Sequence, residues 1–177
     1  MNKAIFLDRD GTINVDKNYL YKIEDWEFID GAIEGLQILQ ELEFKLIVIT
    51  NQSGIARGYY TEEDAQIMFD YMMDELKKSG VMIDHVYYCP HMDGECDCRK
   101  PKLGLFYKAQ KDFDINFSKS YAIGDKLRDL SICEKENVRG FLLTHEGKDL
   151  GDKIRACKNL LEAALLIKEE QGIQNGK

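Results

Sequence analysis

The strongest constraint on the fold is a series of short apolar runs separated by longer segments with helical periodicity. The runs are rich in β-branched and aromatic residues, nearly continuous rather than alternating, and occupy residues 3–8, 45–50, 84–89, 120–125 and 138–143. This is how strands that are buried on both faces of a parallel sheet look in sequence. The runs therefore predict a parallel sheet that is covered on both sides.

The segments between the runs place apolar residues three and four positions apart, as amphipathic helices do. We expect helices at 31–42, 61–79, 103–112, about 127–136 and 155–170. A possible capping box, Thr61 to Asp64, opens the second of them. Alternation of strands and helices predicts an α/β fold with a doubly wound, Rossmann-like parallel sheet. We expect a single domain over residues 1–177, with a frayed tail at about 172–177.

Composition excludes several classes of protein. The chain has 44% hydrophobic and 32% charged residues, as ordinary globular proteins do. No apolar run reaches the roughly 18 residues of a membrane span, and the start, MNKAIFLDRDG, lacks the apolar region of a signal peptide. We therefore expect a cytoplasmic protein without a membrane partner. The net charge of −8 argues against nucleic acid as a partner, because nucleic-acid surfaces are basic.

Polar residues with chemical potential follow the predicted strands, where open α/β sheets bind their ligands. Asp8 and Asp10 follow the first run, and Asp125 follows the fourth, with Asp129 four positions later. Such carboxylates can hold Mg²⁺, or serve as nucleophile and acid–base group. The turn TNQSG after the second run can cradle a phosphate group. Taken singly, each feature is also compatible with a plain turn.

Taken together and in order, DRDGT, the TN turn, the lysine of RKP and the GD pair resemble the haloacid dehalogenase superfamily over roughly residues 3–145. More narrowly, DRDGTIN, TNQSGIARGYY and CPH…CDCRKPKLG resemble the D-glycero-D-manno-heptose 1,7-bisphosphate 7-phosphatases, relatives of the histidinol phosphatases. The resemblance implies a Mg²⁺-dependent phosphatase. It would remove the 7-phosphate of this small sugar bisphosphate through an aspartyl phosphate, in nucleotide-activated heptose biosynthesis. No insertion is long enough for a separate cap domain.

The resemblance also implies roles for individual residues. Asp8 would be the nucleophile and Asp10 the acid and base, while Thr50 and Lys100 would steady the transferring phosphoryl group. Mg²⁺ would bind the Asp8 carboxylate, the main-chain carbonyl of Asp10, and Asp125. The residues implied in substrate binding are Asp16, Lys17, Asn18, Tyr19, Thr50, Asn51, Gln52, Ser53, Arg99, Lys100 and Lys126.

A cluster of metal-binding residue types lies in the loop 89–98. Its pattern is Cys-x-His-x4-Cys-x-Cys, with ligands Cys89, His91, Cys96 and Cys98. Three thiolates and an imidazole suit tetrahedral Zn²⁺, whereas a disulfide would leave one cysteine over and ignore the histidine. Four protein ligands close the coordination shell, so we expect a structural zinc-binding loop that fixes the backbone of Arg99 and Lys100.

Three other functions remain as alternatives. The protein could act on histidinol phosphate or another small phosphomonoester, or, with less support from the charge, on polynucleotide 3′-phosphates. A zinc-nucleated binding module without activity is disfavoured because both Asp8 and Asp10 are present. The sequence leaves the anomer of the heptose open, and we expect a monomer.

Overall fold

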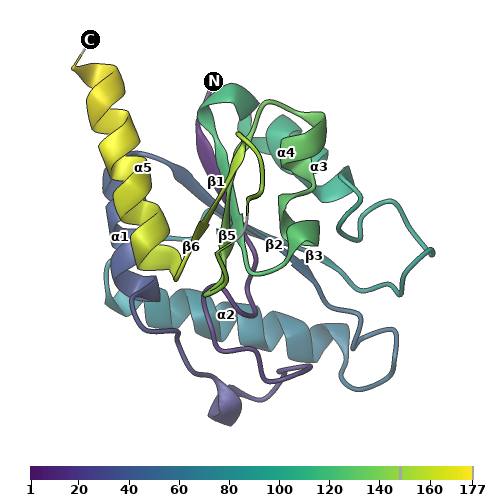
Figure 1. Cartoon of the computed structure of the whole chain (residues 1–177). Coiled ribbons are helices and arrows are strands. Elements are labelled where there is room, and N and C mark those ends of the chain that lie inside the picture. Colours follow the sequence, from purple (N-terminus) through teal and green to yellow (C-terminus); the bar gives the residue numbers. More distant parts are fainter. Residues whose placement is uncertain (148, 177) are drawn as a thin grey trace.

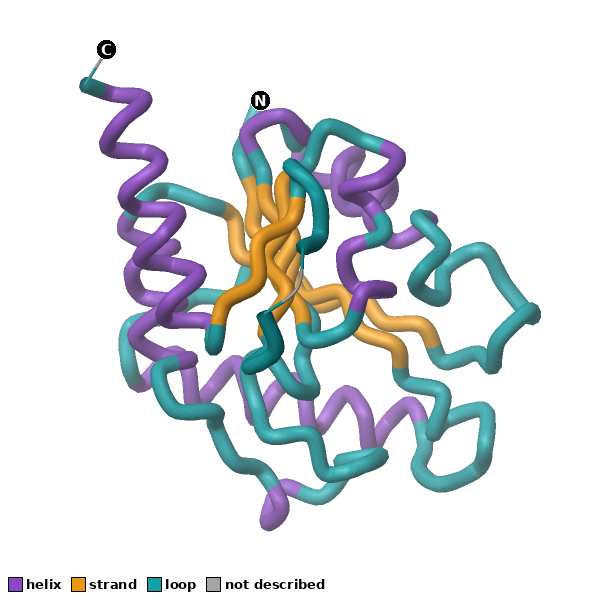
Figure 2. Tube along the Cα trace, in the orientation of Figure 1, coloured by secondary structure: helices purple, strands orange, loops and turns teal. Residues whose placement is uncertain are grey.

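The computed structural model describes residues 1–147 and 149–176 and contains a six-stranded sheet between two layers of helices (Figures 1 and 2). Every strand pair is parallel, and the strand order is β3-β2-β1-β4-β5-β6. The strands are β1 (Ala4–Leu7), β2 (Lys45–Asn51), β3 (His85–Cys89), β4 (Tyr121–Gly124), β5 (Arg139–Leu143) and β6 (Ile154–Cys157). The predicted doubly wound α/β fold is confirmed.

Helices cover both faces of the sheet because successive strand side chains point to opposite sides. Ile5 and Leu7 belong to a core cluster shared with α1 (Ala32–Glu41), α2 (Glu62–Lys78) and α5 (Leu160–Asn175). Phe6 belongs to a second cluster, shared with α3 (Gly104–Phe113) and α4 (Ile132–Lys135). Figure 1 shows α1 and α5 packed side by side on one face, with α3 and α4 on the other.

Two expected helices differ from the structure. The segment predicted as a helix from 155 begins instead as the edge strand β6, which pairs with β5, and α5 starts only after Asn159. The Asn159 side chain accepts a hydrogen bond from the Glu162 main chain at 2.9 Å, which caps the helix at this point. The α5 helix runs to Asn175, through part of the tail expected to fray, while residue 177 lies outside the described residues.

The predicted helix at 127–136 divides into a 3₁₀ turn, Leu127–Leu130, and the short helix α4. The Asp129 carboxylate accepts a hydrogen bond from the Lys126 main chain at 3.1 Å, which favours the tight turn. The predicted capping box of α2 is confirmed, because the Thr61 hydroxyl and Asp64 carboxylate each accept a bond from the other residue's main chain. In the described part of the chain, no helix is long and apolar enough to cross a membrane.

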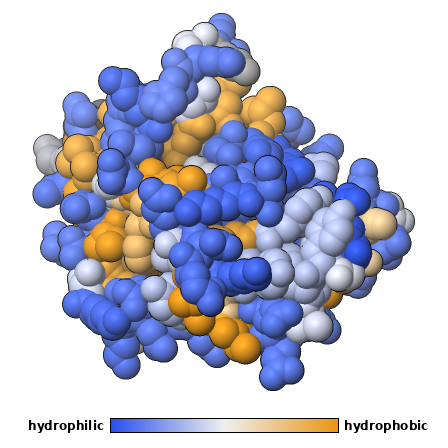
Figure 3. Space-filling view, turned by 90° about the horizontal axis from the view of Figure 1, so that it is seen from below, coloured by the Kyte–Doolittle hydropathy of each residue, from blue (hydrophilic) through white to orange (hydrophobic). Residues whose placement is uncertain are grey.

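The position of β1 explains where a ligand can bind. From β1 the chain extends to β2 and β3 on one side, and later to β4, β5 and β6 on the other. Such a switch point leaves a crevice beyond the carboxyl ends of the central strands. In Figure 1 the loop that follows β1 lies below the sheet, and the view from below in Figure 3 shows a largely hydrophilic face with smaller hydrophobic patches.

Candidate active site

A cavity of about 390 Å³ opens at the carboxyl ends of the central strands. Eleven residues predicted from sequence line it, namely Asp8, Asp10, Asp16, Asn18, Tyr19, Asn51, Gln52, Ser53, Arg99, Lys100 and Lys126. Asp129, noted in the sequence only as a carboxylate near Asp125, joins them, as do three residues that the sequence analysis did not single out: Arg57, Tyr60 and Arg128. The fold thus brings most of the predicted residues to one place.

Three predicted residues lie elsewhere. Thr50 is buried at the end of β2, beneath the cavity, and Asp125 lies at the end of β4, beside Asp8. Lys17 forms an ion pair with Glu27 at 3.1 Å and does not line the cavity. Its expected contact with substrate therefore has no support in this geometry.

Lys100 occupies the floor of the cavity, with its side chain only 2% exposed. Its Nζ lies 3.1 Å from Asp8 Oδ1, 2.7 Å from Asp129 Oδ1 and 2.6 Å from the Ile49 carbonyl oxygen. Burial by itself would lower the pKa of Lys100, but Asp8 and Asp129 raise it overall, so the ammonium keeps its charge. A fixed cation therefore lies where the oxygens of a bound phosphate can reach it.

Asn51 holds the main chain of Lys100 in place. Its side-chain amide donates to the Lys100 carbonyl and its side-chain oxygen accepts from the Lys100 N–H, both at 3.0 Å. These two bonds connect the end of β2 to the loop that carries the lysine. The position of Lys100 is therefore fixed from both ends of the residue.

Three carboxylates gather around this lysine. Oxygens of Asp8, Asp125 and Asp129 lie within 4.8 Å of one another. Burial, and after it the negative charge of Asp129, raises the pKa of Asp8 to about 7. The same two causes raise the pKa of Asp125. Asp129 has one oxygen on Lys100 and the other on the Lys126 main chain, whereas Asp125 Oδ1 is buried without a partner. The carboxylate–lysine cluster (Asp8, Lys100, Asp125, Asp129) is thus short of positive charge.

Two glycines make room for these carboxylates. Gly11 has a φ of +83°, and a Cβ at this position would lie 2.2 Å from Asp125 Oδ2. A Cβ at Gly124 would lie 2.4 Å from the Asp129 Cβ. Any residue with a side chain at these two positions would clash with a carboxylate of the site. The glycines of DRDGT and of the GD pair therefore leave the space that these carboxylates occupy.

Asp10 also lines the cavity but has partners of its own. Its carboxylate pairs with the buried Arg9 guanidinium at 3.0 Å and accepts a bond from Asn14 at 2.9 Å. Arg9 was missed in the sequence analysis, because an arginine between two aspartates has no periodicity that would indicate burial. The side chain that the resemblance implies as acid and base therefore has partners of its own, although its charge is close enough to contribute to the raised pKa of Asp8.

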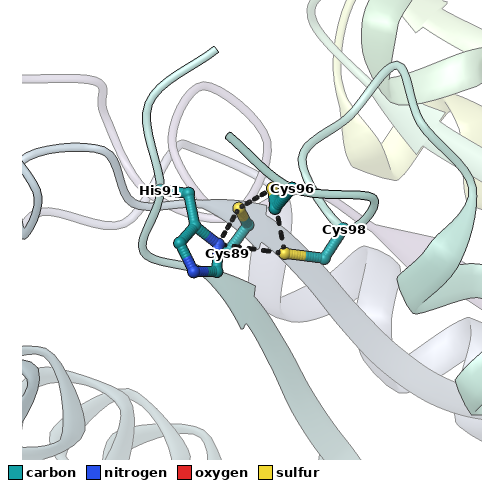
Figure 4. Close-up of side chains that lie close together, drawn as sticks. All are labelled: Cys89, His91, Cys96 and Cys98. Atoms are coloured by element: carbon teal, nitrogen blue, oxygen red, sulfur yellow. Dashed lines mark hydrogen bonds between the residues drawn. The ribbon is translucent and has the colours of Figure 1, made fainter. Parts of the chain in front are cut away.

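The side chains of the four ligands predicted for zinc point toward one another (Figure 4). Adjacent pairs among Cys89 Sγ, His91 Nδ1, Cys98 Sγ and Cys96 Sγ are 3.3–3.5 Å apart. Zinc–sulfur bonds of about 2.3 Å imply ligand separations only slightly longer in a tetrahedral shell. The geometry and donor chemistry of this Cys/His cluster (Cys89, His91, Cys96, Cys98) thus fit a closed zinc site.

Comparison with known proteins identifies the family. Residues 3–137 match the family model described as polynucleotide kinase 3 phosphatase. A D-glycero-alpha-D-manno-heptose-1,7-bisphosphate 7-phosphatase of Campylobacter jejuni is 46% identical over 168 residues, which cover 95% of this chain and 97% of the relative. The chain belongs to the heptose bisphosphate phosphatases of the haloacid dehalogenase superfamily. The family resemblance seen in the sequence is confirmed, and the protein is a phosphatase.

Further relatives of this phosphatase agree with the assignment. A D-glycero-beta-D-manno-heptose-1,7-bisphosphate 7-phosphatase of Haemophilus ducreyi is 46% identical over 154 residues, covering 82% of this chain and 85% of the relative. The crystal structure of D,D-heptose 1,7-bisphosphate phosphatase from B. bronchiseptica, complexed with magnesium and phosphate, has a TM-score of 0.84 at 30% identity. It covers 95% of this chain and 99% of that one.

The rim of the phosphatase cavity carries cations in addition to Lys100. Arg57, Arg99, Lys126 and Arg128 all line it, and Arg99 Nη1 is buried without a hydrogen-bond partner. Lys126 lies 3.6 Å from Asp125. In a chain with a net charge of −8, this local excess of cations favours an anionic substrate.

Proposed function

We propose that this phosphatase removes the 7-phosphate from D-glycero-D-manno-heptose 1,7-bisphosphate with the help of Mg²⁺. The observation that carries the proposal is the division of the cavity into two cationic parts. Lys100 lies among carboxylates at the floor, while the partnerless Arg99 Nη1 lies in the lining. A substrate with two phosphates suits both parts. The names of the relatives support the heptose.

The reaction begins when a carboxylate oxygen of Asp8 attacks phosphorus. The bond between phosphorus and the sugar oxygen breaks, and the sugar oxygen takes a proton from Asp10. In the second half, Asp10 takes a proton from water, whose oxygen attacks the phosphorus and breaks its bond to Asp8. Lys100 and Thr50 bind the phosphoryl oxygens, on which charge collects during both transfers.

The residues present fit a bound Mg²⁺. Asp125 Oδ1 is buried and unpartnered, and the three carboxylates have only two lysines for partners, Lys100 and the more exposed Lys126. Asp8, Asp125 and the main-chain carbonyl of Asp10 would hold the ion, whose charge supplements Lys100 at the phosphoryl group. Since Arg9 and Asn14 bind the Asp10 carboxylate, this side chain stays free of the metal for proton transfer.

Zinc would have a structural role in this mechanism. Cys98 directly precedes Arg99 and Lys100 in the chain, so a Cys98 thiolate held by the metal restricts the backbone of both cations. Cys89, the first of the four ligands along the chain, is the last residue of β3. The metal would thus join the loop to the sheet without touching substrate.

The alternatives differ in what the rim must bind. The matching family model is described as polynucleotide kinase 3 phosphatase, but the net charge of −8 disfavours a long polyanion. Histidinol phosphate has a single phosphate group and would leave Arg99 without an anion. Both alternatives keep the same chemistry at Asp8.

A substrate panel tests the proposal. With Mg²⁺ present, kcat/KM is compared for the α- and β-anomers of the heptose bisphosphate, the heptose 7-phosphate, histidinol phosphate and an oligonucleotide with a 3′-phosphate. We expect a bisphosphate anomer to exceed each of the others by at least about tenfold, because one well-placed charged contact contributes roughly 1.5–3 kcal/mol. If histidinol phosphate or the oligonucleotide ranks first, the substrate assignment is wrong. Arg99→Ala should reduce the advantage of the bisphosphates selectively.

A further inference from the structure

One buried amide connects two groups of the proposed mechanism. Gln52 is 3% exposed, and its Nε2 lies 3.0 Å from Thr50 Oγ1 and 3.4 Å from Asp10 Oδ2. An amide nitrogen has two hydrogens, so both contacts can exist at the same time. A single atom of Gln52 therefore reaches a phosphate-binding hydroxyl and the acid–base carboxylate.

Tyr60 determines which way this amide faces. The Tyr60 hydroxyl donates to Gln52 Oε1, and burial raises the pKa of Tyr60 to about 12, so the phenol keeps its proton. If the amide were turned over, its oxygen would face the Asp10 carboxylate, and two acceptors would oppose each other. Tyr60 and Asp10 together therefore select the orientation in which Gln52 donates to the site.

Tyr60 is itself fixed by packing. Its ring stacks on Tyr21 with centroids 5.4 Å apart and an interplanar angle of 14°, and it shares a small core cluster with Ala65 and Phe69. A Cβ at Gly54 would lie 2.2 Å from its Cε1, so the loop passes directly over the ring. The hydroxyl cannot follow a shift of Gln52 without disturbing this packing.

We infer that Gln52, oriented by Tyr60, is a positioning residue that directs both Thr50 and Asp10. Because Thr50 Oγ1 accepts from Gln52, its own proton remains available to a phosphoryl oxygen. Arg9 Nη2 donates to both Asp10 oxygens and Asn14 donates to Oδ1, so Gln52 is the partner that holds Oδ2 on the Thr50 side. The inference rests on the proposed roles of Thr50 and Asp10.

This assignment differs from the contact with substrate expected for Gln52. Both functional atoms of the Gln52 amide already have protein partners in Tyr60, Thr50 and Asp10. Substitution should therefore lower kcat and leave KM nearly unchanged, since the interactions lost matter for the transition state. A residue that binds substrate would raise KM instead.

The test uses Tyr60→Phe, Gln52→Met and the matched control Tyr88→Phe in the full-length enzyme. Tyr88 packs on the same cluster, but its hydroxyl bonds Glu62 on the surface at 2.9 Å. On a sugar phosphate that the wild type hydrolyses, we expect kcat to fall about tenfold for Tyr60→Phe and up to about 100-fold for Gln52→Met, a part of the 10²–10⁴ that acid–base catalysis supplies. Tyr88→Phe should match the wild type.

The leaving group separates positioning from a general loss of structure. When nitrophenyl phosphate is the substrate, the leaving nitrophenolate needs no proton from Asp10. Its pre-steady-state burst should therefore fall less in both variants than the rate of the first turnover of the sugar phosphate. Equal losses on the two substrates, a raised KM, or a Tyr60→Phe enzyme as active as Tyr88→Phe would overturn the inference. Failure of the proposed function would show in the wild type itself, as a different preferred sugar phosphate, whereas these ratios to wild type would persist.

Discussion

The carboxylate–lysine cluster and the Cys/His cluster are neighbours that are assembled in opposite ways. In the first, Asp8, Lys100 and Asp125 come from distant parts of the sequence and meet because β1 lies between β2 and β4. In the second, all four ligands lie within residues 89–98, at the end of β3 and in the loop that follows it. The first therefore depends on the whole sheet, whereas the second depends on a short segment.

The two clusters therefore have different proposed roles: the first supplies the groups that react with phosphorus, and the second positions Arg99 and Lys100. Damage to the carboxylate–lysine cluster removes groups that act on phosphorus, so it should affect the rate directly. Loss of the Cys/His cluster would reach the reaction indirectly, chiefly because Cys98 directly precedes Arg99 and Lys100 in the chain. Four predictions test this contrast, in order of decreasing effect.

Asp8→Asn should abolish turnover, with a loss on the order of 10⁴-fold or more in kcat, because an amide cannot serve as the nucleophile. Steady-state phosphate release measures the loss, and metal analysis should find an unchanged zinc content. Continued phosphate release above background by this variant would exclude Asp8 as the nucleophile.

Asp129→Asn should reduce kcat about 100-fold, because a catalytic group displaced by about 1 Å loses this much and Lys100 loses its nearer partner, at 2.7 Å. The free energy of unfolding should fall by about 3 kcal/mol, as for other broken buried ion pairs. Urea denaturation measures this, with Glu75→Gln on the surface of α2 as a control that removes an exposed pair. Equal stability of the two variants would contradict a structural role for the Lys100–Asp129 pair.

Cys98→Ser should lose zinc and lower kcat/KM by roughly 10- to 100-fold, because the backbone of Lys100 is less well held. Magnesium affinity should hardly change, since Asp8 and Asp125 follow other strands. Metal analysis and kinetics are run in parallel, with Cys133→Ala as a control that removes a buried thiol outside the cluster. Full activity of folded, zinc-free enzyme would show that the loop needs no metal.

The smallest effect concerns pH. Burial raises the pKa of Asp8 to about 7 from an ordinary 3.8, so between these values the folded, metal-free state binds more protons than the unfolded one. Stability should therefore fall as pH rises through this interval, up to about pH 7. Urea denaturation of metal-free wild type and Asp8→Asn measures this slope.

The difference between the two proteins isolates Asp8 from other titrating groups. Asp8→Asn should lose part of the slope, and Mg²⁺ should weaken it in the wild type by favouring the ionised carboxylate. A wild-type slope that is the same as that of Asp8→Asn would show that Asp8 is ionised in the metal-free fold.

Local patterns in the sequence predicted much of this molecule, for identifiable reasons. The central strands β1, β2, β4 and β5 were visible because both faces of each are buried, which leaves a nearly continuous apolar run. The edge strand β3 is only partly buried and was visible from its valine and two tyrosines. The edge strand β6 is buried at Cys157 but exposed at Arg155, so it has no such run and was taken for the start of a helix. The prediction of one continuous helix at 127–136 was wrong for another reason. Asp129 accepts hydrogen bonds from the Lys126 main chain and the Lys100 side chain, and these bonds favour a tight turn at this point.

The sequence by itself determined which residues carry the chemistry. The reactive residues can be identified directly in the motifs DRDGT, TNQSG and RKP. The Cys/His cluster can be recognised because its four ligands are close together in the chain. Only the tertiary structure decided the partners of those groups: Asp129 for Lys100, Arg9 for Asp10, the main chain of Lys100 for Asn51, and Glu27 for Lys17. The physical reason is that a hydrogen bond or ion pair needs its two partners within a few ångströms, and which segments come that close is set by strand order and packing rather than by local pattern.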